Sequence, residues 1–186
     1  MAERFEGKRV LLVMDDRIER EGRRFPAAAG ILLGLGLGGF FDGIVLHQLL
    51  QWHHMLSSAG YPPDTIENLR VNTFADGLFH TATYGFVLAG VLLLWRRAHR
   101  PHLWWSGRML AGSMLTGFGA FNLIEGAINH HLLKIHHVNE TVPPGHWIWW
   151  DVGFLTWGAA MFFVGILLLR HGGAPCGGEL PTCSGD

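Results

Sequence analysis

Four long apolar stretches alternate with shorter polar segments along the chain. They cover residues 27–50, 74–95, 107–131 and 147–169. Each stretch is close to the ~20 residues that an α-helix needs to cross ~30 Å of hydrocarbon. The third is the least apolar, because it carries Glu125 and two histidines near its end. The pattern predicts an all-α protein with a four-helix transmembrane bundle over residues 26–171.

The two ends of the chain differ from this apolar part. Residues 1–25 are mostly polar and are expected to form a cytoplasmic N-terminal segment without a cleavable signal peptide. Residues 172–186 are rich in Gly and Pro, which predicts a flexible cytoplasmic tail. The tail contains Cys176 and Cys183, whose spacing lacks the tight CxxC pattern of a metal site.

The first and third apolar stretches share a polar pattern at an offset of 83 residues. Acid, glycine, histidine and paired histidines correspond one to one: Asp42 with Glu125, Gly43 with Gly126, His47 with His130, His53 with His136 and His54 with His137. The second and fourth stretches correspond at an offset of 75, with Asp76 matched by Asp151. This predicts two tandem α-hairpin repeats, about 26–97 and 104–171, related by a pseudo-twofold axis along the membrane normal.

Glycines in the first stretch indicate how its helix packs. Gly30, Gly34 and Gly38 recur every four residues and therefore share one helix face. Small residues at this spacing let the backbones of two membrane helices approach closely. We therefore expect a close helix–helix contact along this face.

The basic residues predict the orientation. All fourteen Lys and Arg residues except Arg70 and Lys134 lie at the chain ends or in the central connection at 96–108. By the positive-inside rule, both termini are then cytoplasmic and the protein is a multi-pass protein of the inner (plasma) membrane. The expected partners are the lipid bilayer and metal ions, with a homo-oligomer or a respiratory-complex partner left open. A net charge of −1 gives no indication of nucleic-acid binding.

Carboxylates and imidazoles inside apolar spans are costly and mark functional sites by default. The candidate metal ligands are Asp42, His47, His53, His54, Asp76, His80, Glu125, His130, His131, His136, His137 and Asp151. A helix rise of ~1.5 Å per residue places the four carboxylates in one layer near the outer membrane face. Such a mixture suits iron, zinc or copper. The groups suffice for two ions, one in each half.

Straight α-helices would not bring all these groups together. At 100° per residue, Asp42 and His53 share a face, and His47 lies roughly 140° away. Both odd-numbered helices are expected to continue into water beyond their paired histidines, as far as the prolines that follow. Two acids also have a purely structural interpretation: Asp76 as part of a capping box begun by Thr73, and Asp151 as a charge at a helix N-terminus.

The chain from about Phe25 to Gly172 resembles an uncharacterised family of predicted bacterial four-span integral membrane proteins. The residues that carry the resemblance are Gly39-Phe40-Phe41-Asp42-Gly43, His47-Gln48, Trp52-His53-His54, Asp76-Gly77-Leu78-Phe79-His80, Asn122-Leu123-Ile124-Glu125-Gly126 and His146-Trp147. The resemblance implies the fold and the membrane location, and it implies no activity.

Three functions fit these residues. A metal-dependent membrane oxidoreductase would use one or two ions near the outer face, and the sequence favours it slightly. A metal-handling protein would deliver copper or zinc to envelope or respiratory enzymes. A b-type haem protein would hold its iron between His47 and His130. Whether the protein is an enzyme stays open at this point.

Overall fold

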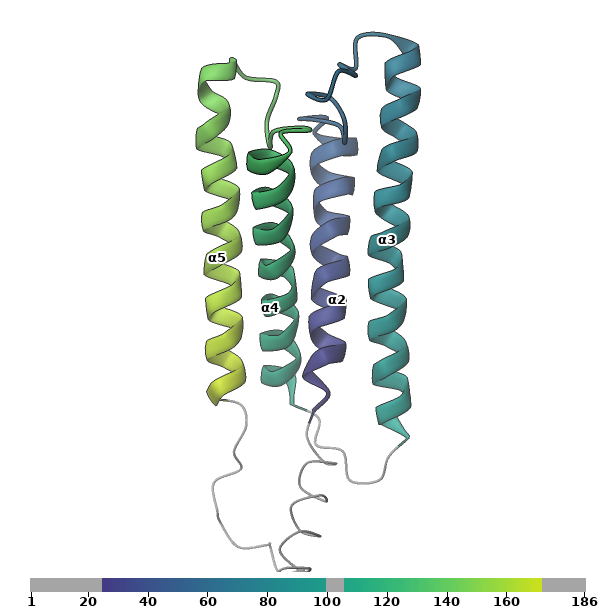
Figure 1. The fold of residues 1–186 in the computed structure, drawn as a ribbon. Helices are drawn as coiled ribbons and strands as arrows, with labels where there is room; N and C mark the ends of the chain where they lie inside the picture. The colour runs from purple at the N-terminus through teal and green to yellow at the C-terminus, as the bar shows by residue number, and fades with distance from the viewer. Residues whose placement is uncertain (1–24, 100–105, 172–186) are drawn as a thin grey trace, which may run out of the picture.

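The computed structural model describes residues 25–99 and 106–171, and these residues form one bundle of helical rods (Figure 1). The elements in chain order are α2 (Ala27–Phe40), the π-helix η1 (Phe41–Leu49), α3 (Ile66–Ala98), α4 (Gly107–Glu125), the π-helix η2 (Gly126–Leu132), the 3₁₀ turn η3 (Pro144–His146) and α5 (Trp147–His171). The described part of the chain contains no strand. The all-α prediction is confirmed, whereas the predictions for the N-terminal segment, the tail and its two cysteines lie outside the described residues.

Three helical segments are long and apolar enough to cross a membrane: Ala27–Leu49, Ile66–Ala98 and Pro144–His171. These confirm three of the four predicted spans. The third predicted span, which forms α4 and η2, is not among them. Its polar residues, Glu125 and the histidines that follow, lower its hydropathy.

Helix α3 begins at Ile66, eight residues before the predicted start of its span. The side chain of Thr65 caps it by accepting a hydrogen bond from the backbone N–H of Asn68. Thr73 therefore lies inside the helix and caps nothing. The capping-box interpretation of Asp76 is wrong.

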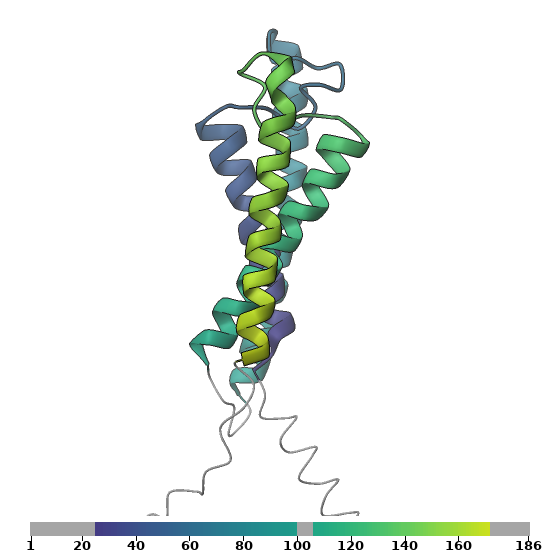
Figure 2. The same cartoon turned by 90° about the vertical axis from the view of Figure 1, so that its left-hand side faces the viewer.

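The two central rods are α2 and α4, with α3 packed on α2 and α5 packed on α4 (Figure 1). Figure 2 shows that α2 and α4 cross and then diverge toward the end that carries the connecting segments 50–65 and 133–143. The divergence opens a wedge between η1 and η2. The connecting segments lie at this end of the bundle.

Glycines make the crossing possible. A Cβ at Gly34 would clash with the carbonyl oxygen of Met114, and a Cβ at Gly117 would clash with that of Ile31. Gly30 and Gly38 also lie against α4, at Ser113 and Phe121. The predicted glycine face is thus confirmed, and its partner is α4.

Glycines likewise line the contacts with the outer helices. Gly36 touches the backbone of α3 at Thr83 and Val87, and Gly119 touches that of α5 at Gly158 and Phe162. Most large apolar side chains instead point outward, as expected for a bundle surrounded by lipid. The bundle is therefore held largely by close backbone contact, which is typical of membrane helices.

We predict that Gly117→Ala destabilises the protein by about 1–3 kcal/mol, because the added methyl group must push α2 and α4 apart. Thermal unfolding in detergent measures the effect. Gly77→Ala is the matched control, since a Cβ there meets nothing within 4 Å. Equal stability of the two variants would contradict the close crossing.

Candidate metal centre

Each central helix widens into a π-helix at its acid. In a π-helix the hydrogen bonds run from residue i to i+5, so the fifth residue along lies near the first. Asp42 Oδ2 accordingly lies 3.1 Å from His47 Nε2, and Glu125 Oε1 lies 3.2 Å from His130 Nε2. The predicted angular separation of Asp42 and His47 is wrong, because it assumed α-helical geometry. π-Helical turns occur frequently at functional sites.

Two residues after the end of each π-helix, the backbone is left-handed. Gln51 has φ 50° and Lys134 has φ 52°, values that are uncommon for residues other than glycine. The next residue in each case donates its backbone N–H back to the helix, Trp52 to Leu46 O (2.9 Å) and Ile135 to Asn129 O (3.0 Å). The helices therefore stop at Leu49 and Leu132, and the predicted extension into water is wrong.

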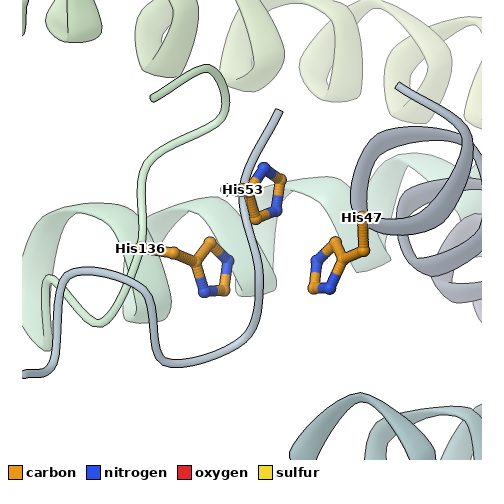
Figure 3. A group of neighbouring side chains, drawn as sticks. All are labelled: His47, His53 and His136. Carbon is orange, nitrogen blue, oxygen red and sulfur yellow. The ribbon is translucent and has the colours of Figure 1, made fainter. Parts of the chain in front are cut away.

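The chain then folds back into the wedge and buries two more histidines. His47, His53, His130 and His136 are exposed by only 0%, 2%, 1% and 0%. Their rings form one cluster, with centroids 4.2 Å apart for His47 and His53, 4.5 Å for His53 and His136, and 5.0 Å for His130 and His136. Figure 3 shows the rings of His47, His53 and His136 turned toward one another, the first from η1 and the others from the two connecting segments.

Two overlapping groups in this cluster could hold a metal ion. One ligand atom each from His47, His53 and His136 lie within 4.8 Å of one another. The same is true of Glu125, His130 and His136. His136 belongs to both groups, so the two halves of the cluster meet at this residue.

Nδ1 of His47, His53 and His136 donates to a fixed acceptor, whereas His130 Nδ1 has no hydrogen-bond partner among the described residues. His53 Nδ1 donates to Val138 O (2.9 Å), and His136 Nδ1 donates to Met55 O (3.0 Å). His47 Nδ1 donates to Asp76 Oδ1 (2.8 Å), and His130 Nδ1 lies 3.7 Å from Asp151 Oδ1. A histidine that donates from Nδ1 and is neutral carries its lone pair on Nε2. Metal-ligating histidines typically show this arrangement, with the second N–H held by a carboxylate or a backbone carbonyl.

Asp76 and Asp151 also hold the returning segments in place. Asp76 Oδ1 accepts the backbone N–H of Met55 (3.1 Å), and Asp151 Oδ1 accepts that of Val138 (2.9 Å). Each acid thereby holds the residue whose carbonyl accepts a hydrogen bond from a buried histidine of the other segment. Their second oxygens contact the outer histidines His54 (3.4 Å) and His137 (2.7 Å). Asp76 and Asp151 are thus placed to orient the cluster.

Nε2 of His53 and Nε2 of His136 have no hydrogen-bond donor as a partner among the described residues. His53 Nε2 has no hydrogen-bond partner among the described residues. His136 Nε2 lies 3.0 Å from Glu125 Oε1, although His136 already donates from Nδ1. Two acceptors at this distance require a cation between them, either a proton or a metal ion. Burial, and then the neighbouring His136 and His47, lower the pKa of His53 well below its usual value, so it is neutral and able to bind a metal.

Seven of the twelve predicted ligands lie outside both groups: Asp42, His54, Asp76, His80, His131, His137 and Asp151. His80 packs against Phe40 and Phe79, and a Cβ at Gly43 would clash with its imidazole. His131 is only half-buried, and neither group includes it. His54 and His137 lie at the outer edge of the cluster, with side chains 14% and 17% exposed.

Several supporting contacts were not predicted from the sequence. The carbonyls of Met55 and Val138 leave no trace in a side-chain pattern. Glu140 accepts hydrogen bonds from the backbone N–H of His137 (3.0 Å) and the hydroxyl of Ser58 (2.6 Å), so it joins the two connecting segments. One signal was available: Glu140 lies 83 residues after Ser57, whose Oγ accepts from the backbone N–H of His54 (3.2 Å).

Comparison with known proteins places the chain in a family. Searches of the curated proteins and of the solved structures give no match. The family described as "Predicted membrane protein (DUF2243)" matches residues 29–172, which is most of the chain. The chain therefore belongs to this DUF2243 family of predicted membrane proteins, a domain of unknown function.

Proposed function

We propose that this membrane protein binds one or two transition-metal ions in its buried histidine cluster and keeps them as a resident, redox-active cofactor. The observation that carries the proposal is the common orientation of the imidazoles. Nδ1 of His53 and Nδ1 of His136 each donate to a backbone carbonyl. Nε2 of His53 then has no partner among the described residues, and Nε2 of His136 meets only the carboxylate of Glu125. A bound cation would satisfy the lone pairs and the buried acids together.

A purely structural role explains these residues less well. In ordinary protein cores the large majority of buried side-chain polar atoms have at least one hydrogen-bond partner. Here His53 Nε2, Asp42 Oδ1 and Glu125 Oε2 lack hydrogen-bond partners among the described residues, although all are buried. Uncompensated polar groups are especially costly inside a membrane bundle. A metal ion removes the cost for the groups that bind it.

The ligand sets follow from the two groups. With bonds of about 2.0–2.1 Å, the donor atoms around a tetrahedral ion lie roughly 3.3 Å apart. The candidate ligand atoms lie within 4.8 Å of one another. Metal binding would therefore draw them closer by up to about 1.5 Å. Because one Nε2 binds one ion, His136 can serve only one group at a time: a single ion at His47, His53 and His136, or a single ion at Glu125, His130 and His136. In the second case Asp42, the counterpart of Glu125, could complete a second site with His47 and His53. Imidazole with carboxylate suits zinc, iron or copper.

Burial favours a resident cofactor over metal delivery. Ions enclosed by residues that are at most 6% exposed exchange slowly with solvent, whereas a delivery protein must release its cargo. A resident copper or iron would supply electron transfer, which favours the oxidoreductase interpretation. Metal handling is the second candidate, and the outer histidines His54 and His137 support it as an entry point.

Haem is the least supported cofactor. A porphyrin between His47 and His130 would need the space between these two rings. The ring of His53 lies 4.2 Å from that of His47 and 6.2 Å from that of His130, and the ring of His136 also neighbours both. These two rings would have to leave before haem could enter.

We further propose that the two hairpins are tandem repeats around a pseudo-twofold axis, with α4 as a fourth, central span. Contacts that correspond at the offsets of the sequence pattern support this. The crossing contact of Gly34 with Met114 corresponds to that of Gly117 with Ile31, and the bond from His53 to Val138 corresponds to that from His136 to Met55. The basic residues support cytoplasmic termini and a cluster near the outer face of the inner membrane.

Elemental analysis of the purified protein tests metal binding. We predict one or two Cu, Fe or Zn ions per wild-type chain and loss of most of the metal in His53→Ala and His136→Ala, because each substitution removes a buried Nε2. His99→Ala is the matched control, since His99 is exposed at the far end of α3. Unchanged metal content in both cluster variants, or a wild-type chain without stoichiometric metal, would contradict the proposal.

Labelling of single cysteines tests the orientation. We predict that Ala59→Cys, in the first connecting segment, reacts with a membrane-impermeant maleimide in right-side-out vesicles when Cys176 and Cys183 are replaced by serine. His99→Cys should react only after the membrane is permeabilised, because the positive-inside rule places that end in the cytoplasm. The reverse pattern would invert the proposed topology.

A further inference from the structure

Asn122 is a fully buried amide on α4, one helical turn inward of Glu125. Its exposed fraction is 0%, and neither its Nδ2 nor its Oδ1 has a hydrogen-bond partner among the described residues. Glu125 Oε2 is unpartnered in the same sense, while Glu125 Oε1 faces His130 and His136. Asn122 and Glu125 are three residues apart on α4, so these three unpartnered polar atoms belong to neighbouring positions on one helix.

The buried hydroxyl groups of the helices are satisfied by carbonyls of their own helices. Thr83 donates to His80 O (2.9 Å), Thr116 to Gly112 O (2.8 Å) and Ser113 to Met109 O (2.7 Å). An asparagine amide cannot be satisfied by one such bond, because it offers two donors and an acceptor. Asn122 is thus an exception that requires an external partner.

The packing around Asn122 indicates that its position is specific. A Cβ at Gly158 of α5 would lie 2.7 Å from Asn122 Cβ, so the amide fits only beside a glycine. The residue 83 positions earlier is Gly39, which instead packs against Thr83 of α3. The corresponding contact in the first hairpin therefore contains Thr83, whose hydroxyl donates to a carbonyl of its own helix. Only the second hairpin has an amide at this contact.

Helix geometry brings Asn122 and Glu125 within reach of one bridging molecule. Side chains at i and i+3 are neighbours, with Cβ atoms about 5–6 Å apart. The two side chains make no direct hydrogen bond, whereas a water molecule between them could donate to Glu125 Oε2 and accept from Asn122 Nδ2. Buried waters typically bind groups of this kind, which are otherwise unsatisfied.

We propose that Asn122 and Glu125 Oε2 bind one water molecule inside the bundle, and that this water holds Glu125 Oε1 toward His130 and His136. Asn122 is then a positioning residue of the metal centre. The effect on the metal rests on the proposed function, whereas the water site itself does not.

A double-mutant cycle tests the water site in metal-free protein. Asn122→Leu keeps the side-chain volume and removes the amide, and Glu125→Met removes the carboxylate. We expect Asn122→Leu to lower the melting temperature in the wild-type background, because it leaves Glu125 Oε2 and the water without a partner. In the Glu125→Met background the same change should be neutral or stabilising. Thr116→Val, which removes only a bond within its own helix, is the control and should leave the metal centre unchanged.

The metal-loaded protein supplies the second readout. We expect Asn122→Leu to weaken metal binding about 10–100-fold, as substitutions of residues that orient ligands do. With Cu(II) as the probe, its electron paramagnetic resonance spectrum should shift in Asn122→Leu and stay unchanged in Thr116→Val. Asn122→Thr, which copies the self-satisfied hydroxyl of Thr83, should behave like Asn122→Leu and serves as the folded variant if leucine is not tolerated.

The outcomes separate the two proposals. A melting temperature that rises in Asn122→Leu, or effects of Asn122→Leu and Glu125→Met that simply add, would overturn the water site. A wild-type chain that binds no metal would overturn the proposed function, and the cycle in metal-free protein would still decide whether Asn122 and Glu125 share a ligand.

Discussion

The candidate site depends on hydrogen bonds that point away from it. His53 and His136 each donate Nδ1–H to a backbone carbonyl of the opposite connecting segment, and His47 donates to Asp76. These bonds fix both the tautomer and the direction of each ring. Without them, the Nε2 atoms would be free to turn toward other donors. The two segments are also mutually dependent, because each provides the carbonyl that orients the histidine of the other.

The crossing of the central helices provides the space in which the two connecting segments meet. Close approach at Gly34 and Gly117 forces α2 and α4 to cross, and crossed rods diverge on either side of the contact. The wedge that opens at one end receives the two returning segments. In a bundle of large side chains the helices would lie farther apart at the crossing. The close crossing of α2 and α4 thus determines the space available to the histidines at the end where these helices diverge.

Much of the fold and the candidate ligands could be predicted from the sequence. The apolar stretches predicted the helices, and the offset of 83 residues matched Asp42, His47 and His53 with Glu125, His130 and His136, but it did not show which of these side chains meet. The π-helices could not be predicted, because the sequence carries no marker that distinguishes them from α-helices. The left-handed residues Gln51 and Lys134 are not glycines, so the reversal of the chain was hidden as well.

The role of each candidate ligand also could not be predicted from the sequence. Composition alone cannot tell a carboxylate that binds a metal from one that orients a histidine, and Asp76 and Asp151 prove to contact Nδ1 atoms and loop peptides. His80 and His131 were as plausible as His53 by residue type and depth. Their exclusion from both groups follows from ring direction, which depends on tertiary contacts tens of residues away.

X-ray absorption spectroscopy of the metal-loaded protein tests whether the buried histidines bind the metal, because it reports the atoms bound to the ion. We predict two or more imidazole ligands per ion, with the remaining light-atom ligands supplied by carboxylate or water and no sulfur. A spectrum dominated by sulfur, or one without the multiple scattering that imidazole produces, would show that the buried histidines do not bind the metal.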